Sequence, residues 1–377
     1  MDFEFSDEQQ QFAQALRKWT ERAYTFEHRQ QIAGSTEGVN DADWSALTDL
    51  GLVGLGVPAE RGGFDGTGVD HMIAMQEMGR AMLVEPLFST LWGCAFLRLA
   101  NSQHLLLERV AEGQVRLACA LGESASRYDL DVVECVALAC DGGWCLNGEK
   151  SVVLHGAQAD VLIVSARTSG TRSCRDGISL FAVNADAPGL RRSDFAMVDG
   201  QRAARVMLQD VLVPADALIG VQGGAWPIID AAMDAGVALL CAEAIGVLEV
   251  LTEATLEHLR TRQQFGVTIG KFQALQHRMA EVYVHLEQSR SMAMLAAIKC
   301  TDAEVVQRRR SVSAAKARIG EALRFVGQQA VQLHGGLGVS DEMRVSHLFK
   351  RATVIEMSLG DTQFHVERFM EQLACTA

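Results

Sequence analysis

Four short stretches in the second half of the chain are the most informative part of the sequence. Gln332–Gly338 reads QLHGGLG, Phe349–Arg351 reads FKR, and Ser358–Gln363 reads SLGDTQ. Earlier, Arg262–Gly266 reads RQQFG. Taken alone, Gly335–Gly336 can simply end a helix, because glycine is the usual residue just past the last helical turn. The four stretches are informative because they occur together, in this order and at this spacing.

Length and composition describe a globular protein with more than one domain. The chain has 377 residues, which exceeds the size at which one hydrophobic core stops growing, so two or three domains are expected. Hydrophobic residues make up 49% and charged residues 21% of the chain, and only five prolines occur. The net charge of −13 argues against a nucleic-acid partner. It does not exclude an anionic ligand, since a local basic cluster can oppose the overall sign.

Neither a secretory signal nor a membrane span is expected. Met1–Phe5 lacks a basic region followed by an apolar run. The longest apolar stretch, Gly236–Leu251, is interrupted by Glu243 and Glu249, and we expect it to be too short to cross a bilayer.

The nine cysteines predict reduced, partly buried thiols in a cytoplasmic protein. No Cys-x-x-Cys pair occurs. Cys135, Cys140 and Cys145 are evenly spaced, but no histidine or further cysteine completes a metal-binding set. We therefore expect no metal site.

Both ends of the chain read as helical. In residues 1–115, Ser6 followed by Gln9 is a capping-box pattern, and apolar residues then recur at helical spacing. Residues 221–377 form long helical stretches with short breaks, and a second capping box is expected to begin at Thr301. The pattern predicts an N-terminal all-α domain and a C-terminal four-helix bundle.

The middle of the chain, residues 116–220, has a different periodicity. Short runs rich in β-branched residues alternate with Gly, Asp and Asn turns. This pattern predicts a middle antiparallel β domain. The runs are Val161–Val164, Ile178–Val183 and Val206–Leu208.

Together, these stretches resemble the flavin-binding signatures of the acyl-CoA dehydrogenase family. The resemblance covers essentially the whole chain, from Gly51–Pro58 and Gly62–Gly63 to Asn147–Lys150 and Gly156–Asp160. It implies the acyl-CoA dehydrogenase fold, FAD as cofactor, an acyl-CoA substrate and electron-transfer flavoprotein as electron acceptor. Three strings are similar to the branch typified by pimeloyl-CoA dehydrogenase small subunits, whose members often work as paired, unlike subunits: Leu146–Gly156, Ala159–Gly170 and Ala242–Gly246.

The resemblance assigns several residues to the FAD diphosphate. Arg262 matches an arginine that contacts the FAD of a neighbouring subunit, and its guanidinium suits phosphate oxygens. Taken alone, an arginine before an aromatic residue and a glycine is usually a surface residue that packs its stem. Gln264 and Phe265 carry over beside it, and Gln332 and Gly336 match positions that contact the same diphosphate. At the other end of the cofactor the resemblance places Thr362, for which helix capping is the alternative, and Gln363.

The flavin ring is expected to meet the β domain. The family presents backbone N–H groups and a threonine hydroxyl to the ring, within a stretch that here contains Leu121 and Gly122. Because Gly122 replaces the threonine, only backbone contacts carry over. Val152 and Leu154 occupy the places of a tryptophan and a threonine behind the ring, so a ring stack and a hydroxyl are lost.

The expected reaction is α,β-dehydrogenation of an acyl-CoA thioester, which needs a carboxylate base for the α-proton. Leu359 stands where the family carries that glutamate, although its backbone N–H can still polarise the thioester carbonyl. The family's alternative position maps to Gly236. Glu243 and Asp361 are candidate substitute bases, and Asp234, at a CoA-contacting position, is a weaker one. The alternative for each of these carboxylates is a solvated, capping or arginine-paired role. His334 is a further candidate for catalysis, and its alternative is a loop residue that packs near FAD.

Three functional hypotheses follow. The chain is an FAD-dependent acyl-CoA dehydrogenase subunit, working in a homotetramer or in a heterotetramer with an unlike subunit. Alternatively, it is a non-catalytic partner that completes the FAD site of an unlike catalytic subunit. A third hypothesis is a different flavin reaction on the same fold, such as desulfination or monooxygenation. The resemblance hints at dicarboxylic, cyclic or steroid-derived acyl groups.

Overall fold

The computed structural model describes residues 5–374, so the prediction drawn from Met1–Phe5 falls almost wholly outside the described residues. The chain forms two compact units. We call Met1–Arg29, Gly68–Leu83 and Val237–Ala377 the helical unit, and Gln30–Thr67 with Val84–Gly236 the sheet unit. Each is described by itself.

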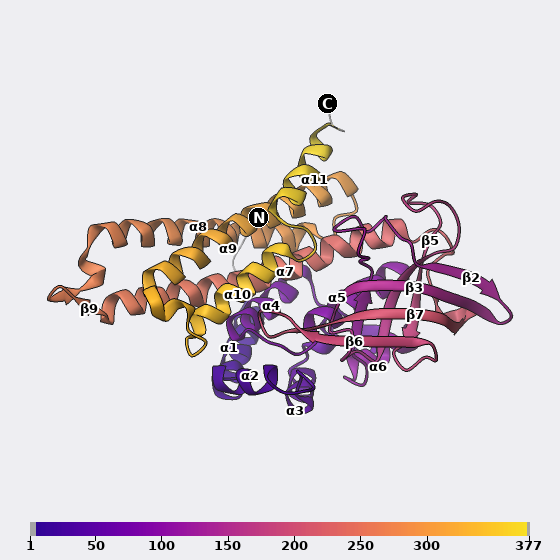
Figure 1. Ribbon diagram of the computed structural model, residues 1–377, viewed down its shortest axis with the longest axis horizontal. Helices are drawn as coiled ribbons and strands as arrows, with labels where there is room; N and C mark the ends of the chain where they lie inside the picture. The colour runs from indigo at the N-terminus through magenta and orange to yellow at the C-terminus, as the bar shows by residue number, and fades with distance from the viewer. Residues whose placement is uncertain (1–4, 375–377) are drawn as a thin grey trace. The chain divides into compact units, whose positions relative to one another are not determined.

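The helical unit is built from long helices, and α8 and α9 lie side by side (Figure 1). Both α10 and α11 also pack on α9, and α1 packs on α4. The helices are α1 (Asp7–Arg22), α4 (Gly68–Ala81), most of α7 (Trp226–Thr261), α8 (Gln273–Lys299), α9 (Val305–His334), α10 (Arg344–Met357) and α11 (Thr362–Ala374).

Helix starts follow the capping chemistry only in part. The predicted capping box at Ser6 is confirmed, since the Ser6 side chain accepts from the Gln9 N–H and the Gln9 side chain accepts from the Ser6 N–H. The prediction at Thr301 is wrong. Glu304 itself is the N-cap of α9, and its carboxylate accepts from the first-turn N–H groups of Val306 and Gln307.

The expectation that the apolar stretch Gly236–Leu251 is too short to cross a bilayer is wrong, because this stretch is part of the long helix α7. The helix is 36 residues long, so Gly236–Leu251 is part of a helix that is long and apolar enough to cross a membrane. However, 94% of its most apolar window is buried inside the protein, as in a core helix. The burial of this helix, and not a short length, explains its hydrophobic composition.

The sheet unit contains one eight-stranded sheet, in the order β6-β7-β3-β2-β4-β5-β8, with β1 paired to β4. Most pairs are antiparallel, as predicted, but β1–β4 and the single β2–β4 contact are parallel. The predicted runs lie in β4, β5 and β7. The strands are β1 (Leu117–Ala120), β2 (Val136–Cys140), β3 (Gly143–Leu154), β4 (Val161–Arg167), β5 (Ile178–Asn184), β6 (Leu190–Ala196), β7 (Arg202–Pro214) and β8 (Leu218–Ile219).

Shorter elements complete the chain. Helices α3 (Asp41–Asp49), α5 (Leu87–Ala100) and α6 (His104–Ala111) belong to the sheet unit, and α2 (Phe26–Ala33) runs across the boundary between the units. The eight described cysteines are free thiols, some buried and some exposed. From residue 5 to residue 374, no group of three or more side chains has the make-up of a metal site.

Candidate cofactor site

The residues predicted to bind the diphosphate gather at one end of the helical unit. The imidazole of His258, in the last turn of α7, stacks on that of His334, the last residue of α9, with 4.4 Å between ring centroids. Arg262 follows one turn after His258, and its N–H donates to the His258 carbonyl at 2.9 Å. The stacked rings therefore bring the end that carries Arg262 next to the end that carries Gln332 and Gly336.

Gly335 and Gly336, which follow α9, leave the backbone accessible to a ligand. Gly335 has a φ of +61°, a conformation that favours glycine. Gly336 has no such requirement, and a Cβ added there would meet no atom within 4 Å. Internal packing therefore gives no reason for a glycine at 336, whereas close approach of a diphosphate to the backbone does. Arg262 is exposed and makes no ion pair within the described part of the chain. The residues present fit a diphosphate.

A tight hairpin positions the residues around Arg262. Strands β9 (Gln263–Gln264) and β10 (Val267–Thr268) pair antiparallel. Phe265 and Gly266 between them have φ values of +56° and +79°, as in the two-residue turns that favour the hairpin twist. Gln264 is exposed, and Phe265 is 91% exposed. The hairpin thus presents a large aromatic side chain to the surroundings of the unit.

In the sheet unit, a buried lysine organises the segment predicted to meet the flavin ring. The Lys150 ammonium donates to the Leu121 carbonyl at 3.1 Å, to the Glu123 carboxylate at 2.7 Å and to the Ser165 hydroxyl at 3.0 Å. Lys150 is fully buried. The Ser151 N–H donates to the Gly122 carbonyl at 3.0 Å. These bonds hold the backbone of residues 121–123 in one orientation, a positioning role that motif reasoning did not find for Lys150.

The side chains around this segment are apolar or absent. A Cβ added at Gly122 would meet no atom within 4 Å, so there is space where the resemblance leads us to expect a threonine. Val152 is 55% exposed and Leu154 is half-buried. The chain keeps the backbone groups of the ring site and supplies neither a side-chain hydroxyl nor an aromatic stack at these three positions.

The turn at Leu359, where the resemblance places a catalytic glutamate, is held by buried donors. Leu359 has a φ of +53° and Gly360 a φ of +105°. The Lys316 ammonium donates to the carbonyls of Glu356 and Gly360, both at 2.8 Å. Nε2 of His365 donates to the Leu359 carbonyl at 2.9 Å. These two donors, which are fully buried, lock the turn in shape.

Burial also controls the charge state of the two donors. It lowers the pKa of Lys316 to about 8. Burial lowers the pKa of His365 well below its usual value, and the positive charges of Lys316 and Arg368 act in the same direction. His365 is therefore neutral at pH 7, which fits an imidazole that donates one hydrogen bond to a carbonyl.

Two of the three candidate bases have hydrogen-bond partners that suggest structural roles, and the third is buried. Glu243, on α7, forms a two-bond ion pair with Arg351, on α10, at 2.6 and 2.7 Å, and both side chains are buried. Asp361 accepts from the N–H of Phe364 at 2.9 Å, in the first turn of α11. Asp234 is fully buried in the sheet unit. The geometry of the first two matches the structural alternatives, an arginine-paired glutamate and a capping aspartate.

The last two predicted cofactor residues lie at the start of α11. The Thr362 N–H and hydroxyl both donate to the Glu356 carboxylate, at 3.1 and 2.8 Å, which ties α10 to α11. Gln363 is exposed and donates to Glu367 at 2.7 Å. Both residues are thus close in sequence to the clamped turn, and Gln363 presents its side chain to solvent.

Fold and site together define a flavin-dependent oxidoreductase of the acyl-CoA dehydrogenase type, and sequence comparison agrees. The N-terminal, middle and C-terminal domain models of acyl-CoA dehydrogenase match residues 6–101, 118–211 and 223–374. The chain belongs to the acyl-CoA dehydrogenase family, and the fold predicted from sequence is confirmed.

Curated relatives span nearly the whole chain. A mitochondrial isovaleryl-CoA dehydrogenase of Oryza sativa subsp. japonica is 27% identical, covering 95% of this chain and 89% of the relative. A short-chain specific acyl-CoA dehydrogenase of Megasphaera elsdenii is also 27% identical, covering 96% and 97%. No relative among these names a pimeloyl-CoA dehydrogenase.

Solved structures show the same fold. A steroid acyl-CoA dehydrogenase variant, Tcur3481–Tcur3483, has a TM-score of 0.88 at 27% identity and covers 98% of both chains. The ChsE4–ChsE5 complex of Mycobacterium tuberculosis has a TM-score of 0.88 at 24% identity and covers 99% of both chains. An FAD complex of PigA has a TM-score of 0.89 at 24% identity and covers all of both chains.

Proposed function

We propose that this chain is one subunit of a heteromeric, FAD-dependent acyl-CoA dehydrogenase in which an unlike subunit supplies the α-proton base. One observation carries the proposal. Leu359 stands where the resemblance places the base, in a turn held by buried donors, while the Glu243 carboxylate is engaged in a buried ion pair with Arg351. Freeing Glu243 would leave the arginine charge buried and uncompensated, which costs several kcal/mol, about 3–5 on breaking such pairs.

The chain's own groups have defined roles in this proposal. Arg262 and the open backbone at Gly336 hold a diphosphate, and Gln264, Phe265 and Gln332 surround it. The backbone of Leu121 and Gly122, held by Lys150, contacts the flavin's pyrimidine edge. The N–H of Leu359 polarises a thioester carbonyl. When bound, FAD supplies the acceptor for the hydride that leaves the acyl β-carbon.

The similar structures support a heteromer. The Tcur3481–Tcur3483 and ChsE4–ChsE5 proteins are each named as pairs of unlike chains, and the first is a steroid enzyme. An electron transferring flavoprotein of Acidaminococcus fermentans is also among the similar structures, at 24% identity, where the likeness is one of fold. We accordingly propose a heterotetramer related to the pimeloyl-CoA dehydrogenase small-subunit branch. Its substrate is a cyclic, dicarboxylic or steroid-derived acyl-CoA, and its electrons go to electron-transfer flavoprotein.

Two further predictions accompany this assignment. We propose a cytoplasmic location, on the cysteine usage alone. We also propose domain bounds of 1–115, 116–220 and 221–377, and each of the three family-model matches falls within one of these ranges.

The test is to express the chain alone and together with the acyl-CoA dehydrogenase encoded beside it. We expect the pair to bind FAD and to bleach on addition of an acyl-CoA, and a Glu→Gln change at the neighbour's base to abolish bleaching. The matched variant Glu243→Gln in this chain should leave bleaching of the folded pair intact.

Other outcomes select other functions. A homomer that is yellow and bleaches with an acyl-CoA by itself contradicts the proposal and makes the chain a complete dehydrogenase. Turnover that yields no enoyl-CoA indicates instead a different flavin reaction on this fold.

A further inference from the structure

The stacked imidazoles at the end of α7 and α9 form a cluster that the proposed reaction does not use. His258 and His334 lie with ring planes 26° apart. Arg262 lies one turn beyond His258, directly after the end of α7 at Thr261. The 3-10 turn η4 (Ile269–Lys271) packs against the same end, where the Ile269 N–H donates to the Arg262 carbonyl at 2.9 Å, and it contributes the cation Lys271.

The hydrogen bonds leave proton-accepting nitrogens at this cluster. Nδ1 of His334 donates to the Ala330 carbonyl at 2.8 Å, so its Nε2 is an acceptor when the ring is neutral and a donor when it is charged. The half-buried ring of His258 has no hydrogen-bond partner within residues 5–374. Two imidazoles can thus acquire an N–H donor by protonation, without breaking an existing bond.

The surroundings of His258 disfavour its protonated form. Burial lowers the pKa of His258, and the neighbouring His334 and Arg262 lower it further. No carboxylate counts among the groups that shift its pKa. The free protein therefore holds His258 neutral at pH 7, next to an unpaired arginine and a glycine backbone that nothing covers. The negative charge of an anion bound there would stabilise the protonated imidazole and raise its pKa.

We propose that His258 and His334 form, with Arg262, a proton-coupled binding site for a diphosphate diester, so that the ligand binds together with a proton taken up by the imidazole pair. The inference rests on the proposed function in taking FAD as the natural ligand. It assigns His258, a residue outside the sequence motifs, to the binding of the diphosphate.

The direction of the effect follows from linkage. Because the ligand raises the imidazole pKa, affinity rises as pH falls through the window between the bound and the free pKa values. The diphosphate diester of FAD stays fully ionised across this window, so the protein is the source of the effect. We expect the FAD dissociation constant to fall about five- to tenfold between about pH 7.5 and about pH 6, with tenfold per pH unit as the limit for one proton.

The experiment titrates FAD, and separately ADP-ribose, into the full-length apoprotein with its partner subunit at a series of pH values. Calorimetry in buffers of different ionisation enthalpy counts the protons taken up. His258→Phe keeps a flat ring on His334, and we expect it to remain folded, to bind FAD and to lose most of the pH dependence. His104→Phe, in the sheet unit, is the matched control and should retain the full pH dependence.

The outcomes distinguish a failure of the proton-coupled site from a failure of the proposed function. Binding with the same pH dependence and proton uptake in His258→Phe and in the wild type overturns the inference and leaves the proposed function standing. No FAD binding at any pH by the assembled wild-type protein overturns the proposed function itself. ADP-ribose distinguishes the diphosphate end from the ring end, because it lacks the flavin. Its pH dependence should match that of FAD, and a flat response would also contradict the inference.

Discussion

At the residue scale, Leu359 is one of the non-glycine residues of the helical unit with a left-handed backbone conformation. A left-handed conformation costs a non-glycine residue about 1 kcal/mol, because its Cβ crowds the backbone. Buried hydrogen bonds from Lys316 and His365 offset this cost by fixing the carbonyls on both sides of the Leu359–Gly360 peptide bond. The strain is therefore maintained by the tertiary structure around the turn.

The first prediction concerns this strain. Leu359→Gly should raise the free energy of unfolding by about 0.5–1 kcal/mol, since glycine adopts a positive φ without penalty. Urea unfolding followed by circular dichroism measures the change. Leu359→Ala, which keeps a Cβ, is the control and should bring no gain. Equal stability of Leu359→Gly and Leu359→Ala would show that the turn stores no such strain.

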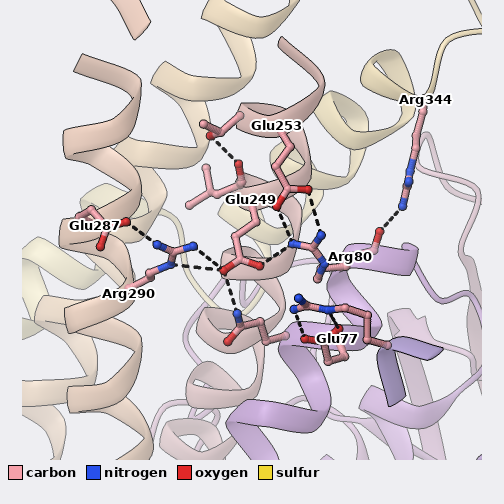
Figure 2. Close-up of polar contacts among 11 residues, drawn as sticks. Glu77, Arg80, Glu249, Glu253, Glu287, Arg290 and Arg344 are labelled. Atoms are coloured by element: carbon pink, nitrogen blue, oxygen red, sulfur yellow. Dashed lines mark hydrogen bonds and ion pairs between the residues drawn. The ribbon is translucent and has the colours of Figure 1, made fainter. Parts of the chain in front are cut away.

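At the element scale, a buried carboxylate joins three helices of the helical unit (Figure 2). Glu249, on α7, accepts from Arg80 on α4 at 2.7 Å and from Arg290 on α8 at 2.8 Å. Gln76 donates a further bond to Glu249 at 2.9 Å, and Arg80 also pairs with the exposed Glu253. Burial alone would raise the pKa of Glu249, but the bonds from Arg290 and Arg80 outweigh it and lower the pKa.

The second prediction is a pH-dependent loss of stability. Because the folded-state pKa of Glu249 is depressed, its contribution is present above the unfolded value of about 4.3 and disappears as pH falls through the folded pKa. Glu249→Gln should cost about 3 kcal/mol at pH 7, as for breaking a buried ion pair. The difference from wild type should shrink below about pH 4.

Glu253→Gln is the matched control for this network, because it removes a different partner of the same arginine. The Glu253 side chain is 60% exposed, so the substitution should cost less than about 1 kcal/mol at any pH. Unfolding midpoints of the two variants from pH 3 to pH 8 test the comparison. Similar losses in both variants would argue against a special role for burial at Glu249.

At the scale of the whole molecule, the predicted cofactor contacts are divided between the two units. Arg262 and Gly336 belong to the helical unit, and Leu121 and Gly122 belong to the sheet unit. In the helical unit, the predicted diphosphate site has the exposed Arg262 guanidinium and an open backbone at Gly336. The ring end has neither the threonine hydroxyl nor the aromatic stack that the resemblance leads us to expect there. This asymmetry is what we expect of a chain that serves a neighbour's cofactor better than its own.

The third prediction tests that asymmetry in the assembled protein. Arg262→Ala should weaken FAD binding about 10- to 100-fold, as expected for the loss of a charge-assisted hydrogen bond to phosphate. Arg262→Lys should recover part of the loss, because it restores the charge without the fork geometry. Flavin fluorescence during titration of the apoprotein measures the affinity.

Arg205→Ala, an exposed arginine on β7 paired with Glu149, serves as the control and should leave the affinity unchanged. If Arg262→Ala bound FAD as tightly as the wild type, the diphosphate would have to be held elsewhere, and the assignment of the whole site would need revision.

Local sequence signals predicted the elements well and the side-chain partners poorly. Ser6 and Gln9 interact within one helical turn, so their capping box could be read directly from the sequence. The capping box predicted from Thr301 to Glu304 is equally local, but Glu304 itself caps the helix. The pairing of Glu243 with Arg351 and the stacking of His258 on His334 join residues far apart in sequence. No periodicity or motif carries that information.

The sequence by itself determined the family and the helical–sheet–helical order, because these depend on residue identity and on spacing along the chain. Only the tertiary structure decided what the remaining carboxylates and imidazoles do. A buried group takes its charge and its role from the partners that packing brings within hydrogen-bonding distance. Arg351 thus makes Glu243 a structural ion-pair partner, and the approach of α9 to α7 places two imidazoles beside Arg262.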